Sequence, residues 1–313
     1  MLPIKLQLPD SFFEEETRCE YTISPEMKKL WAILLDMLDQ VMKICEKHHI
    51  CYYANGGTAL GAVRHQGIIP WDDDIDIMML RSEYNKFIEV APKELEYPYF
   101  MQTEQTDPGS RRGHIQIRNS ATTGILKSEF QYKYKFNQGA FLDIFPLDYA
   151  PDSAEEFLAF KEEVKSIRDK EMIYANLFHP MPWIKRRNIL ANIYNHIEHF
   201  VYKKWAIYNH VESNCYKRYF DKFEQTIQKY NSKPTKHLIN SPLICAGTKQ
   251  LDAADFEGKP VWLPFEMFKI PVPHNYEHTL QTWFGDWHKI VRGGSMHGGL
   301  IFDAEKPYTE YLK

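Results

Sequence analysis

The chain has 313 residues, which is enough for one large domain or two small domains with a real hydrophobic core. Its formal net charge of -4 gives no global basic field, and this excludes a dedicated nucleic-acid binder. The five cysteines are scattered, the chain start shows no secretory leader pattern, and no run of 18 residues is apolar. These features predict a soluble, cytoplasmic protein with reduced thiols.

The first 95 residues predict alternating helices and strands. Ser24-Pro25-Glu26 is typical of a helix start, because Ser caps the first turn and Pro is preorganised for the first helical position. Apolar residues at helical spacing follow it. The elements expected here are an irregular segment over 1–23, a helix over 24–48, a short strand over 51–54, helical turns over 58–65, a strand over 74–80, and a helix that Ser82 caps and that reaches about residue 95.

The next part predicts further strands, and the chain changes character near residue 150. Short apolar runs separated by Gly and polar residues predict strands over 99–103, 114–118, 123–126 and 140–145. Helical patterns follow over 153–170 and from about 182 to 230, and residues 236–313 are mixed. We expect an α+β fold. Residues 1–150 would form a catalytic core with a mixed sheet and flanking helices, and residues 151–313 a mainly helical elaboration packed on it, as one domain or two.

The segment from residue 56 to residue 77 carries the densest chemistry. Gly56 and Gly57 lack Cβ atoms, so their backbone is able to approach a ligand closely, and the amides at the start of the following helix, from Thr58 on, are suited to hold phosphate oxygens. Asp74 and Asp76 are expected on one face of the next strand. Two close carboxylates repel by roughly 4 kcal/mol at an effective dielectric of about 20, and a divalent cation offsets that cost. This is the layout of a metal-dependent, nucleotidyltransferase-type active site.

A third carboxylate is expected to complete this site. Asp143 is the best candidate, because it is a lone acid in an apolar strand and is costly to bury unless it is paired or metal-bound. The alternative is a structural carboxylate that caps a neighbouring backbone or pairs with Arg118, whereas Asp148 is expected to serve the turn that follows. The sequence leaves open whether Asp143 binds Mg²⁺ or Mn²⁺ or accepts a proton. A calcium loop is excluded, because Ile77 stands where such a loop needs glycine.

These motifs resemble the LicD family of phosphocholine transferases and its fukutin-related relatives. The first block covers residues 56–77, with Arg64, Gly67, Pro70, Trp71 and the acidic run from Asp72 to Asp76. The second block is Phe-Leu-Asp-Ile-Phe-Pro-Leu-Asp over 141–148. A third, weaker block covers 280–287 and is followed by Arg292 and His297. Together the blocks extend from about residue 50 to residue 300.

The resemblance implies a nucleotidyltransferase fold and transfer of a substituted phosphate from a CDP-activated donor, with CDP-choline favoured. The acceptor implied is a hydroxyl of a cell-surface glycan, such as lipopolysaccharide or teichoic acid, or of its lipid-linked precursor. Asp74, Asp76 and Asp143 are then the expected metal ligands for Mg²⁺ or Mn²⁺. The catalytic residues expected are these aspartates and Arg64, which either stabilises phosphate charge or pairs with Asp72 or Asp73. The substrate-binding residues expected are Gly56, Gly57, Thr58, Arg292 and His297.

Two other functions stay open at this point. The same metal site would also serve nucleotidyl transfer to a small hydroxylated acceptor, and a degenerate copy would serve as a non-catalytic glycan-binding scaffold. The candidates for an aromatic cage around choline are Tyr132, Tyr134, Phe136, Trp283 and Trp287. Seven basic residues between 185 and 218 indicate either a solvated helix face or a peripheral membrane contact near a lipid-linked acceptor.

Overall fold

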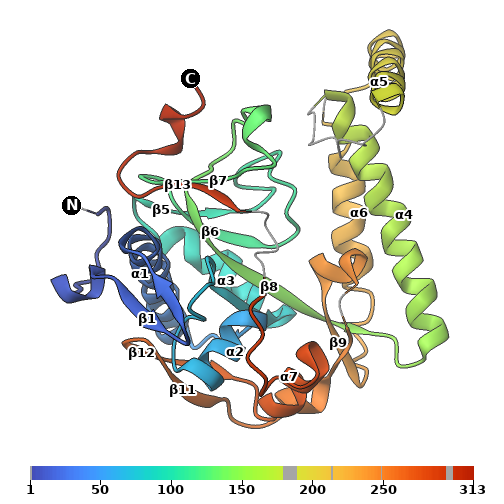
Figure 1. Cartoon of the computed structure of the whole chain (residues 1–313). Helices are drawn as coiled ribbons and strands as arrows, with labels where there is room; N and C mark the ends of the chain where they lie inside the picture. The colour runs from blue at the N-terminus through green and yellow to red at the C-terminus, as the bar shows by residue number, and fades with distance from the viewer. Residues whose placement is uncertain (1, 179–188, 213, 248, 294–298) are drawn as a thin grey trace.

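A long strand, β8 (Ala140–Ala150), runs through the middle of the molecule and organises its central sheet (Figure 1). The computed structural model describes residues 2–178, 189–212, 214–247, 249–293 and 299–313. The mixture of helices and a mixed sheet confirms the predicted α+β class.

Helices and short strands alternate in the first half of the chain, as the sequence predicts from residue 24 on. The prediction that residues 1–23 are irregular was wrong, because two short strands pair there as a hairpin. In chain order they are β1 (Glu16–Arg18), β2 (Tyr21–Ile23), α1 (Pro25–His48), β3 (Tyr53–Ala54), α2 (Gly56–His65), β4 (Asp76–Leu80), α3 (Arg81–Glu94), β5 (Tyr99–Gln102), β6 (Ile115–Asn119) and β7 (Thr123–Leu126). The elements after β8 are α4 (Ala154–Phe178), α5 (Ile189–Tyr208), α6 (Lys217–Ile227), β9 (His237–Asn240), β10 (Leu251–Asp252), β11 (Val261–Phe265), β12 (Phe268–Val272), α7 (Tyr276–Phe284) and β13 (Leu300–Asp303).

The central sheet combines parallel and antiparallel pairs around β8. The first half of β8 lies between antiparallel β6 and parallel β4, and its second half lies between β4 and antiparallel β9. β3 extends the sheet beyond β4, β10 extends it beyond β9, and β5 pairs with β6. Since β9 and β10 follow residue 150, both parts of the chain contribute strands to one sheet. In the same way β13, near the C-terminus, pairs with β7.

The two faces of the sheet pack against different hydrophobic clusters. Ile77 and Ile144 are buried in the main core with the apolar face of α1, while Met78 and Phe145 belong to a second cluster on the opposite face. Side chains alternate between the two faces along a strand, so Asp76 shares the face of Met78 on β4, and Asp143 shares the face of Phe145 on β8. Asp76 and Asp143 therefore lie on that face.

Local differences from the predicted elements have physical causes. Ser24 caps α1 as predicted, because its Oγ accepts a hydrogen bond from the amide of Met27 at 3.3 Å. The prediction that Ser82 caps the next helix was wrong: α3 begins at Arg81 directly from the strand, and Leu80 holds the cap position. β4 begins at Asp76 rather than at residue 74, since β3 is only two residues long and its register with β4 ends at Ile77.

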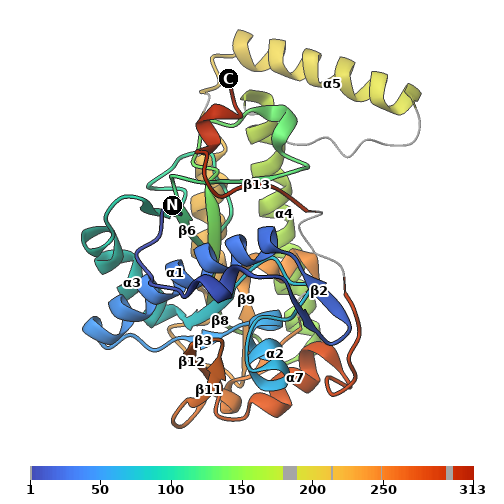
Figure 2. The same cartoon turned by 60° about the vertical axis from the view of Figure 1, so that its left-hand side comes forward.

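The helices after residue 150 stand beside the sheet. α4 packs against α6, and α5 lies against α4 while extending away from the sheet (Figures 1 and 2). The helical region predicted over 182–230 therefore contains two helices, and residues 182–188 lie outside the described residues. Among the helices that the structure describes, none combines the length and apolar character needed to cross a bilayer.

Candidate active site

The glycine pair starts α2 and lies against the acidic loop. Gly56 adopts φ +48°, a left-handed conformation that side chains rarely tolerate. A Cβ on Gly57 would lie 2.9 Å from Oδ2 of Asp72, so glycine is what lets this carboxylate approach the helix start. The first amides of a helix have no carbonyl partner inside it, which makes this end suitable for an anion. The geometry agrees with the predicted phosphate-binding role of Gly56 and Gly57, which stays a prediction.

Thr58 ties the start of α2 to the start of β4. Its Oγ1 accepts a hydrogen bond from the amide of Asp76 at 2.8 Å, and the amide of Asn55 donates to the carbonyl of Asp76 at 3.0 Å. These two bonds fix the backbone of Asp76 beside the glycine turn. Thr58 was predicted to bind substrate, and the structure gives its side chain a positioning contact.

Asp76 and Asp143 sit side by side on neighbouring strands. They are directly paired in the parallel register of β4 and β8, so their side chains emerge from the same face of the sheet. Oδ1 of Asp143 accepts a hydrogen bond from Nε2 of Gln116 at 2.7 Å and lies 3.3 Å from Nε2 of His114. The ring of His114 in turn packs on Phe145, with a 4.5 Å separation of ring centroids. Asp143 is therefore held in a defined orientation.

The acidic loop adds three more carboxylates next to this pair. Asp72, Asp73 and Asp74 each offer an oxygen, and these oxygens lie within 4.8 Å of one another. Nε1 of Trp31 donates to the carbonyl of Asp72 at 3.0 Å and anchors the loop on α1. Burial, followed by the charges of Asp74 and Asp73, raises the pKa of Asp72 to about 8.

Like-charge repulsion extends from the loop to the strand pair. Burial, followed by the charges of Asp74 and Asp143, raises the pKa of Asp76 well above its usual range. Such a cluster is costly for a folded protein without a cation, and perturbed carboxylates of this kind concentrate at functional sites.

The donor set fits a hard divalent cation. Oδ1 of Asp76 is buried and, among the described residues, makes no hydrogen bond. Asp76 feels the charges of Asp74, Asp72 and Asp73, and oxygen-only ligation is what Mg²⁺ and Mn²⁺ prefer. The strand register pairs Asp76 with Asp143, whereas the carboxylates whose oxygens lie within 4.8 Å of one another are Asp72, Asp73 and Asp74. A metal site shared by Asp74, Asp76 and Asp143 stays a prediction.

A buried polar chain supports Asp143 from behind. Gln116 donates to Asp143 and accepts, at its Oε1, a hydrogen bond from Nη2 of Arg118. Arg118 also donates to Oε1 of Gln102 and to the carbonyl of Gly139. Arg118 was weighed as a partner of Asp143, and it supports this acid through Gln116. The support was missed, although polar residues at 114, 116 and 118 alternate along one predicted strand.

Asp148 has a role that differs from the predicted one. It is fully buried, and its two oxygens accept hydrogen bonds from Arg81 at 2.7 and 2.6 Å. Asn231 and Ser241 also donate to it. The prediction that Asp148 serves the following turn was therefore wrong: it is the centre of a buried ion pair between β8 and α3.

Arg64 and Arg292 lie near the third sequence block. Nη1 of Arg64 donates to the carbonyls of Trp287 and Lys289, both at 3.1 Å, so this arginine holds the loop after α7. The guanidinium of Arg292 lies 4.6 Å from the ring centroid of Tyr21. His297, predicted to bind substrate, lies outside the described residues. The catalytic role of Arg64 stays a prediction, and its visible contacts are structural.

The aromatic residues proposed as a choline cage divide into two groups. Tyr132, Tyr134 and Phe136 stack on one another, with centroid separations of 5.7 and 4.9 Å. Trp283 lies in α7 and Trp287 just after it, at the other end of the molecule in both views (Figures 1 and 2). These five residues therefore do not form one cage, and a choline cage would use the aromatic residues of one group only.

The helix start, the paired aspartates and the acidic loop have the arrangement expected of a nucleotidyltransferase-type site. Sequence comparison agrees with this class: the model of a family described as LicD/FKTN/FKRP, nucleotidyltransferase domain, matches residues 49–196. The chain is also 24% identical over 274 residues to the lipopolysaccharide cholinephosphotransferase LicD of Haemophilus influenzae, which covers 84% of this chain and 94% of that protein. Both matches support a LicD family phosphotransferase.

Shorter matches join this chain to two uncharacterized proteins of Rickettsia. One, from Rickettsia typhi, is 41% identical over 60 residues, which is 19% of either chain. The other, from Rickettsia prowazekii, is 35% identical over 79 residues, or 23% of this chain and 30% of that protein. Neither match reaches far enough to bear on function.

Proposed function

We propose that this protein transfers phosphocholine from CDP-choline to a hydroxyl of a cell-surface glycan or of its lipid-linked precursor, with Mg²⁺ or Mn²⁺ as cofactor. The similar Haemophilus protein is described as a lipopolysaccharide cholinephosphotransferase, which supports the transferred group and the acceptor class. We further propose that the reaction takes place in the cytoplasm, with peripheral contact to the membrane that carries the acceptor.

The observation that carries the proposal is the in-register pair of Asp76 and Asp143 beside the start of α2. Asp74 and Asp76, with Asp72 adjacent, would hold the cation, which when bound neutralises charge on the donor phosphates. Asp143 would either join them as a ligand or act as the base. The first amides of α2 would bind the donor phosphates from the other side. Substrate phosphates and protein carboxylates would thereby meet at one point of the sheet.

The transfer itself requires one bond to form and one to break. The acceptor oxygen bonds to the phosphorus that carries choline, and the bond from that phosphorus to the oxygen bridging to CMP breaks, so CMP leaves. The acceptor hydroxyl loses its proton in this step. Asp143 is the candidate to take it, because Gln116 orients it; the alternative role of Asp143 is as a cation ligand.

The test is a donor screen that measures CMP release with a glycan acceptor. We expect release with CDP-choline in the presence of Mg²⁺ or Mn²⁺, and at most weak release with CDP-ribitol, CDP-glycerol and CDP-ethanolamine. Asp74→Asn and Asp76→Asn should abolish release while the protein stays folded. Asp169→Asn, an exposed position on α4, is the matched control and should keep full activity.

The products separate the alternatives. Pyrophosphate release from CTP in place of CMP release from CDP-choline would assign nucleotidyl transfer. Absence of turnover with every donor would leave a glycan-binding scaffold. Full activity of Asp76→Asn would refute the assigned site itself.

A further inference from the structure

α5 turns apolar side chains outward. Among the described residues of this helix, seven large apolar or aromatic side chains are each at least 52% exposed: Ile197, Phe200, Val201, Tyr202, Trp205, Ile207 and Tyr208. Surface helices of globular proteins normally point such residues at the core. α5 does the reverse. At 100° per residue, six of these side chains lie within an arc of about 160° around the helix axis, and we call them the α5 face: Ile197, Phe200, Val201, Trp205, Ile207 and Tyr208.

The orientation of the α5 face follows from one buried residue. Ala206 is fully buried and so marks the side of α5 that packs on the body. At 100° per residue, Ile197, Val201 and Tyr208 lie about 140° to 180° around the helix axis from Ala206. The middle of the α5 face therefore points away from the body, on a helix that lies across the top of the molecule in Figure 2.

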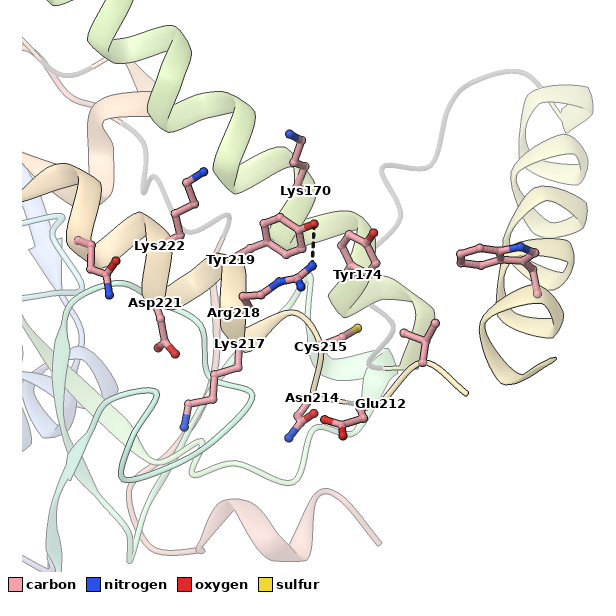
Figure 3. Close-up of a pocket in the computed structure, with 13 residues that line it drawn as sticks. Lys170, Tyr174, Glu212, Asn214, Cys215, Lys217, Arg218, Tyr219, Asp221 and Lys222 are labelled. Atoms are coloured by element: carbon pink, nitrogen blue, oxygen red, sulfur yellow. Dashed lines mark hydrogen bonds between the residues drawn. The ribbon is translucent and has the colours of Figure 1, made fainter. Parts of the chain in front are cut away.

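Basic groups border this apolar surface. Lys203 and Lys204 of α5 are exposed, and Nζ of Lys204 lies 5.5 Å from the ring centroid of Phe200. Next to α5, a groove of about 1110 Å³ is lined by Trp205 and by residues of α4 and of the segment that leads into α6 (Figure 3). Its charged lining residues are the cations Lys170, Lys217, Arg218 and Lys222 and the carboxylates Glu212 and Asp221. Four cations against two carboxylates leave the groove positive.

We infer that α5 is an interfacial helix that lies on an anionic phospholipid bilayer, with the α5 face at the headgroup boundary and the lysines toward anionic headgroups. Charge complementarity selects this occupant, because a protein with a net charge of -4 gathers cations here. Trp and Tyr side chains are suited to such a boundary, where one end is apolar and the other wet. The described part of α5 is too polar to cross a bilayer.

The inference deepens the proposed function and rests on it in one respect: a lipid-linked acceptor gives the enzyme a reason to dock on a membrane. Lipid binding itself needs neither donor nor acceptor, so the two proposals fail separately. Loss of turnover with intact vesicle binding would remove the proposed function alone. Turnover on a soluble glycan without vesicle binding would remove this inference alone.

The experiment is flotation of the full-length protein with vesicles of phosphatidylcholine alone and with about 30% phosphatidylglycerol, at about 0.05 M and 0.5 M salt. Wild type should float with the anionic vesicles at low salt and much less at high salt. The Val201→Glu/Trp205→Glu pair should weaken binding at least about tenfold. Neutralising Lys203→Gln/Lys204→Gln should weaken it about 25-fold, at about fivefold per lysine. Trp262→Glu, an equally exposed tryptophan on β11, is the matched control and should bind as wild type.

Three outcomes would overturn the inference. The first is that wild type does not float with anionic vesicles, and the second is that both α5 pairs float like wild type. The third is a dimer, seen by sedimentation, that Val201→Glu/Trp205→Glu dissociates without any vesicle binding; that result would assign the α5 face to a second copy of this chain. Circular dichroism should show unchanged folding for every variant, because the substituted side chains are exposed.

Discussion

Asp72→Asn should stabilise the protein without metal while weakening its response to metal. The Asp72 carboxyl is squeezed between Gly57, Asp73 and Asp74, and its raised pKa of about 8 reports that the charged form is unfavourable there. Asparagine has the same shape and resembles the protonated acid, including an amide able to donate toward Asp74. The substitution therefore removes the repulsion and keeps the packing.

The sign and size of the effect follow from linkage. Because the folded-state pKa of Asp72 lies above its unfolded value of 3.8, its stabilising contribution is full below that pH and is lost as the pH rises to about 8. One pKa unit corresponds to about 1.4 kcal/mol, and the full shift would exceed about 5 kcal/mol. Since Asp72 is only half-buried, solvent screening reduces the expected gain at pH 8 to about 2 kcal/mol. For a chain of 313 residues this corresponds to a rise in Tm of about 3 °C.

The assay compares thermal unfolding of wild type and variant in EDTA at acidic and alkaline pH, and then with excess Mn²⁺. The gain of Asp72→Asn should be near zero at about pH 4 and largest at about pH 8. With Mn²⁺ the order should reverse or the gap should close, because wild type offers the cation one more charged oxygen. Asp169→Asn should change neither series. A variant that is less stable than wild type at alkaline pH in EDTA would refute the idea that the acidic loop is under electrostatic strain.

Other consequences of the site and its support are measurable. Because Asp72 is largely protonated at neutral pH, Mn²⁺ affinity measured by calorimetry should rise between pH 6 and 8, by up to about tenfold per unit; an affinity independent of pH would show that no proton is displaced. Gln116→Leu should lower kcat about 10- to 100-fold with little change in KM for the donor, while the protein stays folded. If Gln116→Leu loses activity because it unfolds, the role of Gln116 is purely structural. Arg81→Leu should destabilise the fold by about 3 to 5 kcal/mol in urea titrations, and the added change Asp148→Leu should recover part of it.

The sequence predicts those features of the fold that depend only on a few adjacent residues. The Ser24 cap, the strand over 123–126 and the helix that opens at the glycine pair all depend on a few adjacent residues, and the structure has each of them. The acidic loop and Asp143 were identified for the same reason, since a carboxylate in an apolar strand needs a partner wherever it lies.

The sequence does not predict contacts that depend on the pairing register of strands far apart in the chain. Gln116 meets Asp143 only because β6 pairs with β8 in a particular antiparallel register, and no local pattern states that register. The same limit applies to α5. Helical spacing predicts an apolar stripe that includes Ile197 and Val201, but only the burial of Ala206 shows that this stripe faces outward.

The two aspartates of β8 show how one motif serves two purposes. Asp143 and Asp148 are five residues apart in a continuous strand, and an odd separation places them on opposite faces of the sheet. On one face Asp143 pairs with Asp76, another acid, a combination that only a cation or a shared proton makes tolerable. On the other face Asp148 meets Arg81, and Asn231 and Ser241 also donate hydrogen bonds to it. The neighbours of these two aspartates therefore decide their roles. Asp148 forms a structural ion pair, and Asp143, which another acid repels, is the one that the proposed chemistry uses.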